Sequence, residues 1–294
     1  MTERASCPAC ASEDVHPIGQ TADLHFHRCG RCDLVFVHPQ PRERVRAKYV
    51  GEYDLAAHFG AWAPRKRVLN ERRLAELPRP SAGHDLLCDV GCADGQFLEL
   101  AAARGWRTYG VELNPPAAEA ARARGAVVAL GVLEDVDDLP WGQFDVVTSW
   151  DVLEHTPDPR PFSERMARLL APGGTLVVTT LNYDSLVRRV FGFSWSMVCD
   201  DHFTYWNACS LRALFEAQGL RLVQARSFGL GRDFVALLDR LRPRRSTPAT
   251  SGTSSEDGGG WDVNPLVLAA ERACNRLLDA TGAGVGVEAT FCRP

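Results

Sequence analysis

The sequence predicts an α/β protein whose main domain is a doubly wound, mostly parallel β-sheet. From residue 86 onward, apolar strand-like runs alternate with helical stretches at the spacing of βαβ units. The chain has 294 residues and is 45% hydrophobic, which is enough for one large domain with an attachment. In Rossmann-like sheets of this kind, ligands bind at the carboxyl ends of the strands.

Composition and charge exclude several classes of protein. The net charge is −4 and the pI is about 6.1, so a strongly basic surface for nucleic acid is not expected. No stretch reaches the roughly 18 to 20 apolar residues of a membrane helix, and the N-terminus has no secretory signal. Ten cysteines, four of them in two CxxC units, are typical of a reducing compartment. We therefore expect a cytoplasmic protein without a membrane partner.

The two CxxC units predict a metal site in the first forty residues. Eighteen residues separate the pair at 7 and 10 from the pair at 29 and 32, a spacing typical of structural zinc sites. A redox motif would need a single CxxC ahead of a helix. Four thiolates complete a tetrahedral Zn²⁺ site and leave no open position for catalysis. We predict a zinc ribbon over 1–40, with these ligands: Cys7, Cys10, Cys29 and Cys32.

Hydrophobic runs and helix-boundary residues predict the remaining elements in chain order. A helical cap or linker, 41–80, has helices at about 41–58 and 64–77. In the main domain, 81–294, apolar runs predict strands at 86–90, 107–113, 126–131, 144–150 and 174–181. The stretches between them predict helices at 95–105, 115–125 and from near 151 to about 170.

The C-terminal third is expected to complete the same sheet. Asn207 is the expected N-cap of a helix over 207–219. Residues 242–260 are almost free of apolar side chains and predict a flexible insertion between the sixth and seventh strands. A helix over 264–282 and a late antiparallel strand over 285–291 follow.

The stretch LLCDVGCADGQF, 86–97, predicts the kind of ligand. A phosphate loop would need GxxxxGK[ST], and a dinucleotide fold would offer GxGxxG with free amides. Here Asp89 and Asp94 flank the glycines, which disfavours a phosphate and favours a cation. Glu112 ends the next strand, where a carboxylate can accept hydrogen bonds from both ribose hydroxyls. S-adenosylmethionine (SAM) has a ribose, a positive charge and no phosphate.

These motifs resemble those of the class I SAM-dependent methyltransferases. The resemblance covers about 85–229 and rests on DVGCADG, GVELNP, FDVVTSWDVLEHTPDP and RLLAPGGTLVVTT in this order. It implies a seven-stranded sheet, with residues 91–93 lining the methionine moiety, Glu112 holding the ribose and Leu113 beside the adenine. Val132 stands where such families often have Asp, which moves the adenine contact to Leu133 or Glu134. The remaining alternative is a Rossmann-like enzyme with another cofactor.

The full set of expected cofactor-binding residues lies in the loops that follow the first, second and fourth strands and in the loop 131–140. They are Asp89, Gly91, Cys92, Ala93, Asp94, Gly95, Glu112, Leu113, Leu133, Glu134 and Trp150.

Two stretches hold candidates for the chemistry. On a helix beginning near 151, Asp151, Glu154 and His155 would share one face. This group resembles the acid-x-x-Glu-His motif of ubiquinone-biosynthesis O-methyltransferases, which implies a divalent cation such as Mg²⁺ that assists O-methylation. His155 could also act directly as a base. The alternative is that the group caps the helix and lines the cofactor pocket.

The second stretch, 192–220, contains Asp201 and His202, with Tyr205 three residues later. It resembles sugar C-methyltransferases that carry an N-terminal zinc module, in which an acid–His pair performs proton chemistry. Asp occupies the place where Glu is usual. The alternative is a buried or capping histidine. The candidate catalytic residues are therefore His202, Asp201, His155 and Tyr205.

Together these features predict a SAM-dependent methyltransferase that O- or C-methylates a small molecule, in natural-product or sugar-nucleotide biosynthesis. An rRNA methyltransferase is one alternative, but residues 1–40 hold three arginines against five acids. A metal-assisted, catechol-type O-methyltransferase is another. A non-enzymatic SAM-binding or scaffold protein is the third. The oligomeric state stays open.

Overall fold

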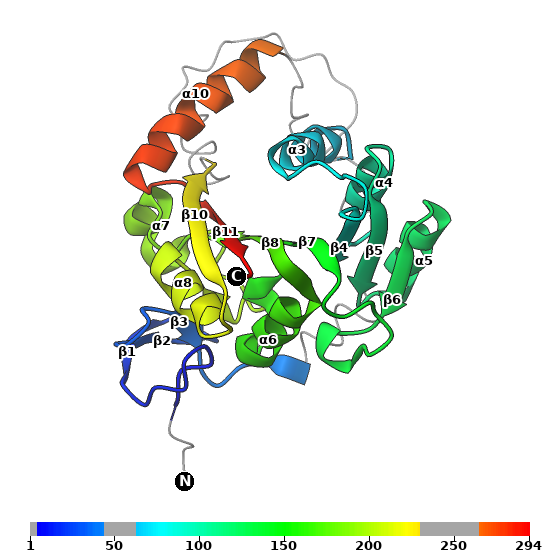
Figure 1. The fold of residues 1–294 in the computed structure, drawn as a ribbon. Coiled ribbons are helices and arrows are strands. Elements are labelled where there is room, and N and C mark those ends of the chain that lie inside the picture. Colours follow the sequence, from blue (N-terminus) through cyan, green and yellow to red (C-terminus); the bar gives the residue numbers. More distant parts are fainter. Residues whose placement is uncertain (1–4, 44–62, 230–264) are drawn as a thin grey trace, which may run out of the picture.

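The computed structural model describes residues 5–43, 63–229 and 265–294. The main domain is built on a seven-stranded sheet in the order β6-β5-β4-β7-β8-β11-β10 (Figure 1). The strands are β4 (Leu86–Val90), β5 (Arg107–Glu112), β6 (Val127–Leu130), β7 (Phe144–Trp150), β8 (Leu170–Leu181), β10 (Arg221–Phe228) and β11 (Gly286–Cys292).

The pairing confirms the predicted doubly wound, mostly parallel sheet. β4 lies between β5 and β7 and is parallel to both, so that Leu87 sits beside Thr108 on one side and Val146 on the other. The last strand, β11, runs antiparallel between β8 and β10. The order of the strands reverses at β4 and β7. The carboxyl ends of these two strands therefore form the crevice where ligands bind in such sheets.

Helices cover both faces of the sheet and bury two separate apolar layers. On one face, α3 (Ala63–Glu76), α4 (Gln96–Ala102) and α5 (Pro115–Ala123) pack against the side of the sheet that carries Leu87 and Val146. On the other, α6 (Pro159–Leu169) and α8 (Ala208–Glu216) pack against the side that carries Cys88 and Val147. Side chains alternate along each strand, so neighbouring residues serve opposite layers. Two further helices are α7 (Leu186–Phe191) and α10 (Pro265–Thr281).

Local capping explains where two of these helices begin. The Asn114 side chain accepts from the Ala117 amide ahead of α5, and prolines occupy the first turn, where no amide donor is needed. Asn207 caps α8 as predicted, in a reciprocal pair with Ser210.

The N-terminal module is a second, four-stranded sheet that includes a strand from the main domain. Its order is β1-β2-β3-β9, with β1 (Val15–Gln20), β2 (His25–Cys29), β3 (Val35–Val37) and β9 (Thr204–Tyr205). β3 lies shortly after Cys32, and no local sequence signal predicted its partner strand at 204–205. The module lies beside α6 and α8 in Figure 1, and its cysteines join their apolar layer. We call β1–β3 and their connections the ribbon.

The helix expected from near 151 to about 170 begins later in the structure. Helix α6, Pro159–Leu169, confirms its second part, but the expected start is wrong: Asp151 has φ +57°, and only a 3₁₀ turn follows at Leu153–His155. Pro157 disfavours helical geometry at the residue before it, which ends that turn. Residues 172–174 lie in an irregular start of β8, because the register jumps from Leu170 to Thr175 opposite β7.

Other expectations fall outside the described residues. Most of the helix expected at 41–58 and the whole insertion at 242–260 lie there. Helix α3 confirms the one expected at 64–77. Across the described ranges, no helix combines the length and apolarity needed to cross a membrane.

Candidate functional site

The loop after β4 uses its backbone amides internally. Gly91 and Cys92 both donate to the carbonyl of Val111, and Ala93 donates to the Glu112 carboxylate at 2.8 Å. A phosphate cradle needs such amides free and converging on the ligand. The loop is therefore preorganised as a surface rather than as an anion nest, in agreement with the prediction of a phosphate-free ligand.

Two glycines give this loop its shape. Gly91 and Gly95 have φ of +81° and +76°, a region that residues with a Cβ rarely adopt. A Cβ on Gly95 would lie 2.7 Å from the Cα of Ala121 in α5, and a Cβ on Gly91 would collide with the Val152 side chain. The glycines thus let the loop pass close to α5 on one side and to the segment after β7 on the other.

Glu112, at the end of β5, is fixed by two amides. Its two carboxylate oxygens accept from Ala93 and Asn114, each at 2.8 Å. Burial raises the pKa of Glu112, while these backbone hydrogen bonds favour the ionised form. The carboxylate is thus oriented before any ligand arrives, beside the glycine loop, where the sequence predicts the ribose contact.

The two aspartates of the loop have different surroundings. Asp89 is 2% exposed and accepts a hydrogen bond from the Thr148 hydroxyl at 2.7 Å, and burial raises its pKa to about 7. Asp94 forms ion pairs with Lys66 at 2.9 Å and Arg124 at 3.4 Å. The negative charge of Asp94 is therefore already matched by the protein. It can hold the wall of a pocket together but offers little net charge to a ligand.

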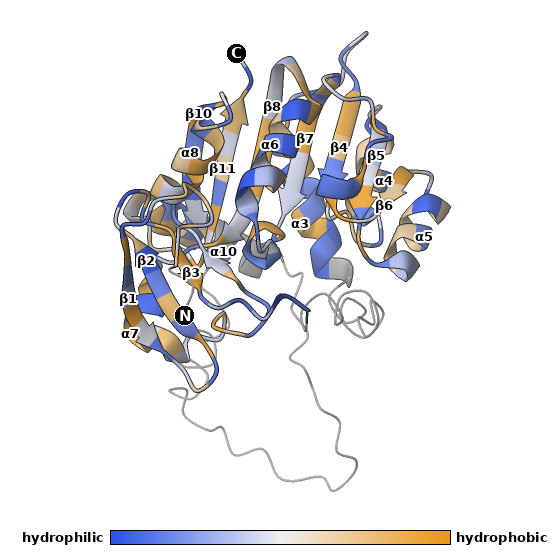
Figure 2. Ribbon diagram, turned by 90° about the horizontal axis from the view of Figure 1, so that it is seen from below, coloured by the Kyte–Doolittle hydropathy of each residue, from blue (hydrophilic) through white to orange (hydrophobic). Residues whose placement is uncertain are grey.

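Helix α3 lies near the carboxyl ends of β4 and β7 (Figure 2). Lys66 reaches Asp94, while Arg73 pairs with Asp151 and lies 4.3 Å from the centre of the Trp150 ring. The indole nitrogen of Trp150 is buried without a hydrogen-bond partner among the described residues. An orphaned buried donor of this kind is normally satisfied by water or a ligand. Sequence reasoning missed both α3 contacts, although the helix is rich in basic residues.

The expected adenine-side residues follow β5 and β6. Leu133 is buried and Glu134 half-buried in a 3₁₀ turn, Leu133–Asp135, and burial raises the pKa of Glu134. Leu113 is half-buried next to Glu112. These positions surround the same crevice, and their roles stay predictions.

A second group of polar residues gathers one turn beyond β7. Glu154, His155 and His202 each offer one atom, and these atoms lie within 4.8 Å of one another. The ring centres of the two histidines are 4.7 Å apart. Asp151, which was expected to complete the group with Glu154 and His155, pairs with Arg73 and Thr179 instead. The metal set predicted from the one-face helix is therefore wrong, and His202 takes the place assigned to Asp151.

Main-chain carbonyls fix the tautomer of both histidines. Nδ1 of His155 lies 2.8 Å from the carbonyl oxygen of Asp201, and Nδ1 of His202 lies 2.7 Å from that of Met197. A carbonyl oxygen only accepts, so Nδ1 carries the proton in each ring. In each neutral ring Nε2 is then the nitrogen that carries the lone pair, the form in which histidine accepts a proton or binds a metal.

Glu154 is the buried acid of the group. It is 4% exposed, and its Oε2 accepts from the Thr180 hydroxyl at 2.7 Å. Burial first, and the charge of Asp151 second, raise its pKa to about 7, against the attraction of His202. Burial and the neighbouring His155 lower the pKa of His202. At neutral pH Glu154 thus lies close to a change of charge, whereas the lowered pKa of His202 favours its neutral ring.

The other predicted catalytic residues lie around His202. Asp201 provides the carbonyl that holds His155, and its carboxylate lies in a second cluster with Cys199 and His202. The Tyr205 ring is 6.3 Å from that of His202, but its hydroxyl is buried and has no hydrogen-bond partner within the described ranges. Sequence reasoning did not single out Cys199. Burial raises its pKa to about 12, which makes it a neutral thiol rather than a nucleophile.

The two groups of residues are neighbours along the chain. Val152, whose side chain packs over Gly91, lies two residues before Glu154. The Phe203 amide donates to the Glu154 carbonyl at 2.8 Å, which joins the His202 segment to the end of β7. The cofactor-side loop and the histidine pair therefore border one region above the carboxyl ends of β4 and β7.

The four ribbon cysteines meet as a tetrad. Sγ of Cys7 is 3.5 Å from that of Cys32, Sγ of Cys10 is 3.6 Å from that of Cys29, and all four lie within 4.8 Å of one another. Ligand sulfurs around a tetrahedral Zn²⁺ at 2.3 Å would be about 3.8 Å apart. The donor set and its spacing therefore fit zinc.

Fold and site together define a class I methyltransferase: a seven-stranded sheet with an antiparallel last strand and a glycine-and-acid crevice at its carboxyl edge. A family model described as a methyltransferase domain matches residues 61–225, more than half of the chain. The chain belongs to this family.

Relatives agree with this assignment. A ubiquinone biosynthesis O-methyltransferase from Xanthomonas oryzae is 39% identical over 100 residues, which cover 32% of this chain and 42% of that protein. The chain spans 42% to 67% of the curated relatives it matches.

Solved structures show the same fold. A Thermotoga maritima SAM-dependent methyltransferase, described as a possible histamine N-methyltransferase, aligns over 86% of this chain and all of that chain at 17% identity, with a TM-score of 0.55. A geranyl diphosphate C-methyltransferase from Streptomyces coelicolor aligns over 78% of this chain and 79% of that chain at 17% identity, with a TM-score of 0.52.

Proposed function

We propose that the chain transfers the methyl group of SAM to a small-molecule acceptor. The cofactor lies on residues 89–95 with its ribose on Glu112, and the acceptor lies against His155 and His202. The observation that carries this proposal is the Glu154–His155–His202 group, which follows directly on the segment that packs over Gly91. Chain order and topology bring a donor site and a proton-accepting group to one region.

The protein's part in the reaction is to position the acceptor and to accept a proton from it. SAM supplies an electrophilic methyl group whose bond to sulfur breaks with its electron pair left on sulfur. Holding the acceptor oxygen or carbon in line with that bond accounts for most of the rate. Nε2 of His155 or His202 accepts the proton that the acceptor loses, while the carbonyl bonds at Nδ1 hold the ring in place.

A divalent cation at the same three residues is a second candidate. Two imidazole nitrogens and one carboxylate form a donor set typical of Zn²⁺, Fe²⁺ or Co²⁺, whereas Mg²⁺ prefers oxygen ligands and retained waters. The carbonyl partners at Nδ1 are the usual outer support of histidine ligands. Such an ion would polarise an acceptor hydroxyl, in a metal-assisted O-methylation.

The acceptor class rests on weaker support. The curated relatives named for ubiquinone biosynthesis favour O-transfer, and the His202 segment favours proton removal from either oxygen or carbon.

We further assign a structural Zn²⁺ to the four cysteines, 1–40 to the ribbon, 41–80 to a cap and 81–294 to the methyltransferase domain. The ten cysteines, all free, support a reducing location such as the cytoplasm.

Native mass spectrometry of the purified chain tests this proposal, with and without added SAM. We expect one zinc and about one SAM per chain. Glu112→Gln should lose SAM, and Glu119→Gln, a matched exposed glutamate on α5, should keep it. A screen of catechol and keto-sugar acceptors with His202→Ala as control then addresses the acceptor. Absence of SAM binding to the unaltered chain would overturn the proposal.

A further inference from the structure

The ribbon contacts the histidine pair through the segment that carries His202. β3 pairs antiparallel with β9, placing Val35 opposite Tyr205 and Phe36 opposite Thr204. The Val37 amide donates to the carbonyl of Phe203 at 2.9 Å. The residue directly after His202 is therefore hydrogen-bonded to the ribbon, and β9 has no other strand partner in the described part of the chain.

A buried polar bond continues this contact into α8. Nδ2 of Asn207, the N-cap of α8, donates to the Asp33 carboxylate at 2.7 Å and to Asp184 at 2.9 Å. The other oxygen of Asp33 accepts from Arg28 at 2.5 Å. Asp33 directly follows the zinc-ligand candidate Cys32, so the end of the cysteine site is tied to the end of the His202 segment.

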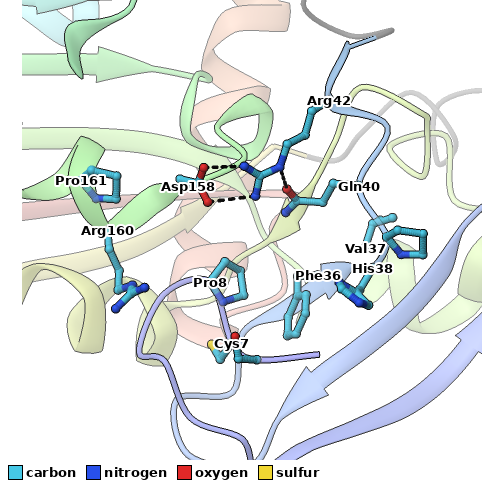
Figure 3. A pocket seen from close by; sticks show the side chains of 12 residues that line it. Cys7, Pro8, Phe36, Val37, His38, Gln40, Arg42, Asp158, Arg160 and Pro161 are labelled. Atoms are coloured by element: carbon cyan, nitrogen blue, oxygen red, sulfur yellow. Dashed lines mark hydrogen bonds and ion pairs between the residues drawn. The ribbon is translucent and has the colours of Figure 1, made fainter. Parts of the chain in front are cut away.

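The chain that follows the ribbon, residues 38–42, contacts the segment that comes directly after His155 (Figure 3). Arg42 binds Asp158 through two hydrogen bonds, at 2.6 and 2.9 Å, and Gln40 donates to the carbonyl of Pro157 at 3.2 Å. These contacts cross a polar hollow of about 580 Å³ between the ribbon and the start of α6. They fix the chain two and three residues after His155.

Aromatic packing closes the same interface. The Phe26 ring of β2 meets Tyr205 edge to face at 5.6 Å and stacks on Phe193 at 4.6 Å. Phe26 and Tyr205 belong to one buried cluster of the ribbon with the 181–205 region, and the partly buried Phe193 packs against it. The ribbon is therefore packed as part of the core rather than appended to it.

We propose that the ribbon, together with residues 38–42 that follow it, is the positioning element of the His155–His202 pair, with Asp33, Gln40 and Arg42 as the positioning residues. Metal binding at the four cysteines orders β3, β3 orders β9, and the two histidine segments keep their spacing only while both are bound to the ribbon. The catalytic meaning of this spacing rests on the proposed function, but the coupling itself does not. The SAM half of the crevice, 86–112, makes none of the ribbon contacts described above.

Asp33→Gly tests the coupling. Asp33 has φ +67°, so glycine removes the carboxylate without adding backbone strain, and Asp23→Gly in the exposed β1–β2 turn is the matched control. Two readouts do not need turnover: hydrogen exchange of peptides covering 153–158 and 199–207, and the ring ¹⁵N signals of His155 and His202. We expect exchange to rise about tenfold in 199–207. We also expect the Nδ1–H signature of His202 to become mixed. Exchange in 86–100, zinc content and SAM affinity should stay unchanged.

Rescue and metal removal complete the test. Asp33→Asn keeps a carbonyl oxygen for Asn207 and tolerates positive φ, so it should restore protection of 199–207. Stripping the metal from the unaltered chain with a chelator should extend the exchange increase to 153–158. An increase confined to 5–38 after metal removal, or an Asp33→Gly effect equal in 86–100 and 199–207, would overturn the proposal. Failure of SAM binding alone would affect the proposed function and leave this coupling standing.

Discussion

The rings of His155 and His202 meet edge to face with centres 4.7 Å apart, and each donates Nδ1–H to a main-chain carbonyl. The two carbonyls belong to Asp201 and Met197, on either side of the turn that precedes His202. Both rings lie in one cluster with the buried acid Glu154, although His202 is 47 positions from His155 along the chain.

Replacing the buried acid should change how stability depends on pH. The folded-state pKa of Glu154 is about 7, above its ordinary value of 4.5, so the folded chain holds a proton that the unfolded chain releases in this interval. This contribution is present below about pH 4.5 and is lost as pH rises through 7. Relative to the unaltered chain, Glu154→Gln should gain on the order of 3 kcal/mol between pH 4.5 and 8.

Urea unfolding at a series of pH values without added divalent ions measures this change. Glu164→Gln, at an exposed position of α6, is the control and should follow the unaltered chain. A difference between Glu154→Gln and the unaltered chain that stays constant with pH would contradict the raised pKa.

Glu112→Gln should weaken SAM binding by about 10- to 100-fold. Glutamine supplies one acceptor oxygen, whereas Ala93 and Asn114 each donate to an oxygen of Glu112. The side-chain NH₂ group of the glutamine would point either at the main-chain N–H of Ala93 or Asn114, which is also a donor, or at the ribose hydroxyls. Isothermal titration with SAM measures the affinity, and an unchanged dissociation constant would remove Glu112 from the site.

Gly95→Ala should destabilise the fold more than Gly125→Ala. Both glycines have positive φ, +76° and +93°, so each substitution carries a backbone cost of about 1–2 kcal/mol. Only at Gly95 does the added Cβ meet backbone, 2.7 Å from the Cα of Ala121, whereas nothing lies within 4 Å at Gly125. Denaturant midpoints of the two variants isolate the cost of this close approach, and equal losses would show that α5 yields easily.

Cobalt should distinguish the two metal-binding groups. With zinc retained at the cysteines, Co²⁺ titration should add a d–d absorption band from nitrogen and oxygen ligands, and His202→Ala should abolish it. His25→Ala, at an exposed ribbon position, should leave the band unchanged. Mg²⁺ at millimolar concentration should not compete. Absence of any Co²⁺ signal beyond the cysteine site would favour histidine as a metal-free base.

The sheet and the cysteine tetrad were predictable because their signals are local. Strand 144–150 is confirmed residue for residue, since a buried parallel strand reads as one apolar run. The cysteine spacing predicted the convergence of Cys7, Cys10, Cys29 and Cys32, and the Asp-x-Gly pattern placed the crevice.

The histidine group was only half predictable. Periodicity suggested a helix from 151, but prolines at 157 and 159 and the positive φ of Asp151 limit the segment to one 3₁₀ turn. Asp151 pairs with Arg73 and lies outside the cluster of Glu154, His155 and His202. The third member, His202, reaches the group only through tertiary packing. The β3–β9 pairing is likewise non-local, and two-residue strands carry no periodicity to read.

The mixed origin of the N-terminal sheet bears on the order of synthesis. Strands β1–β3 leave the ribosome first, but β9, which completes their sheet, is made more than 160 residues later. During that interval the hydrogen-bonding edge of β3 is open, and an unpaired strand edge can pair with a wrong partner, although the three-residue length of β3 limits this risk. A metal taken up early would hold the three strands in shape until their fourth arrives. In the nascent chain, the metal-bound strands β1–β3 would then be folded before β9 is synthesised.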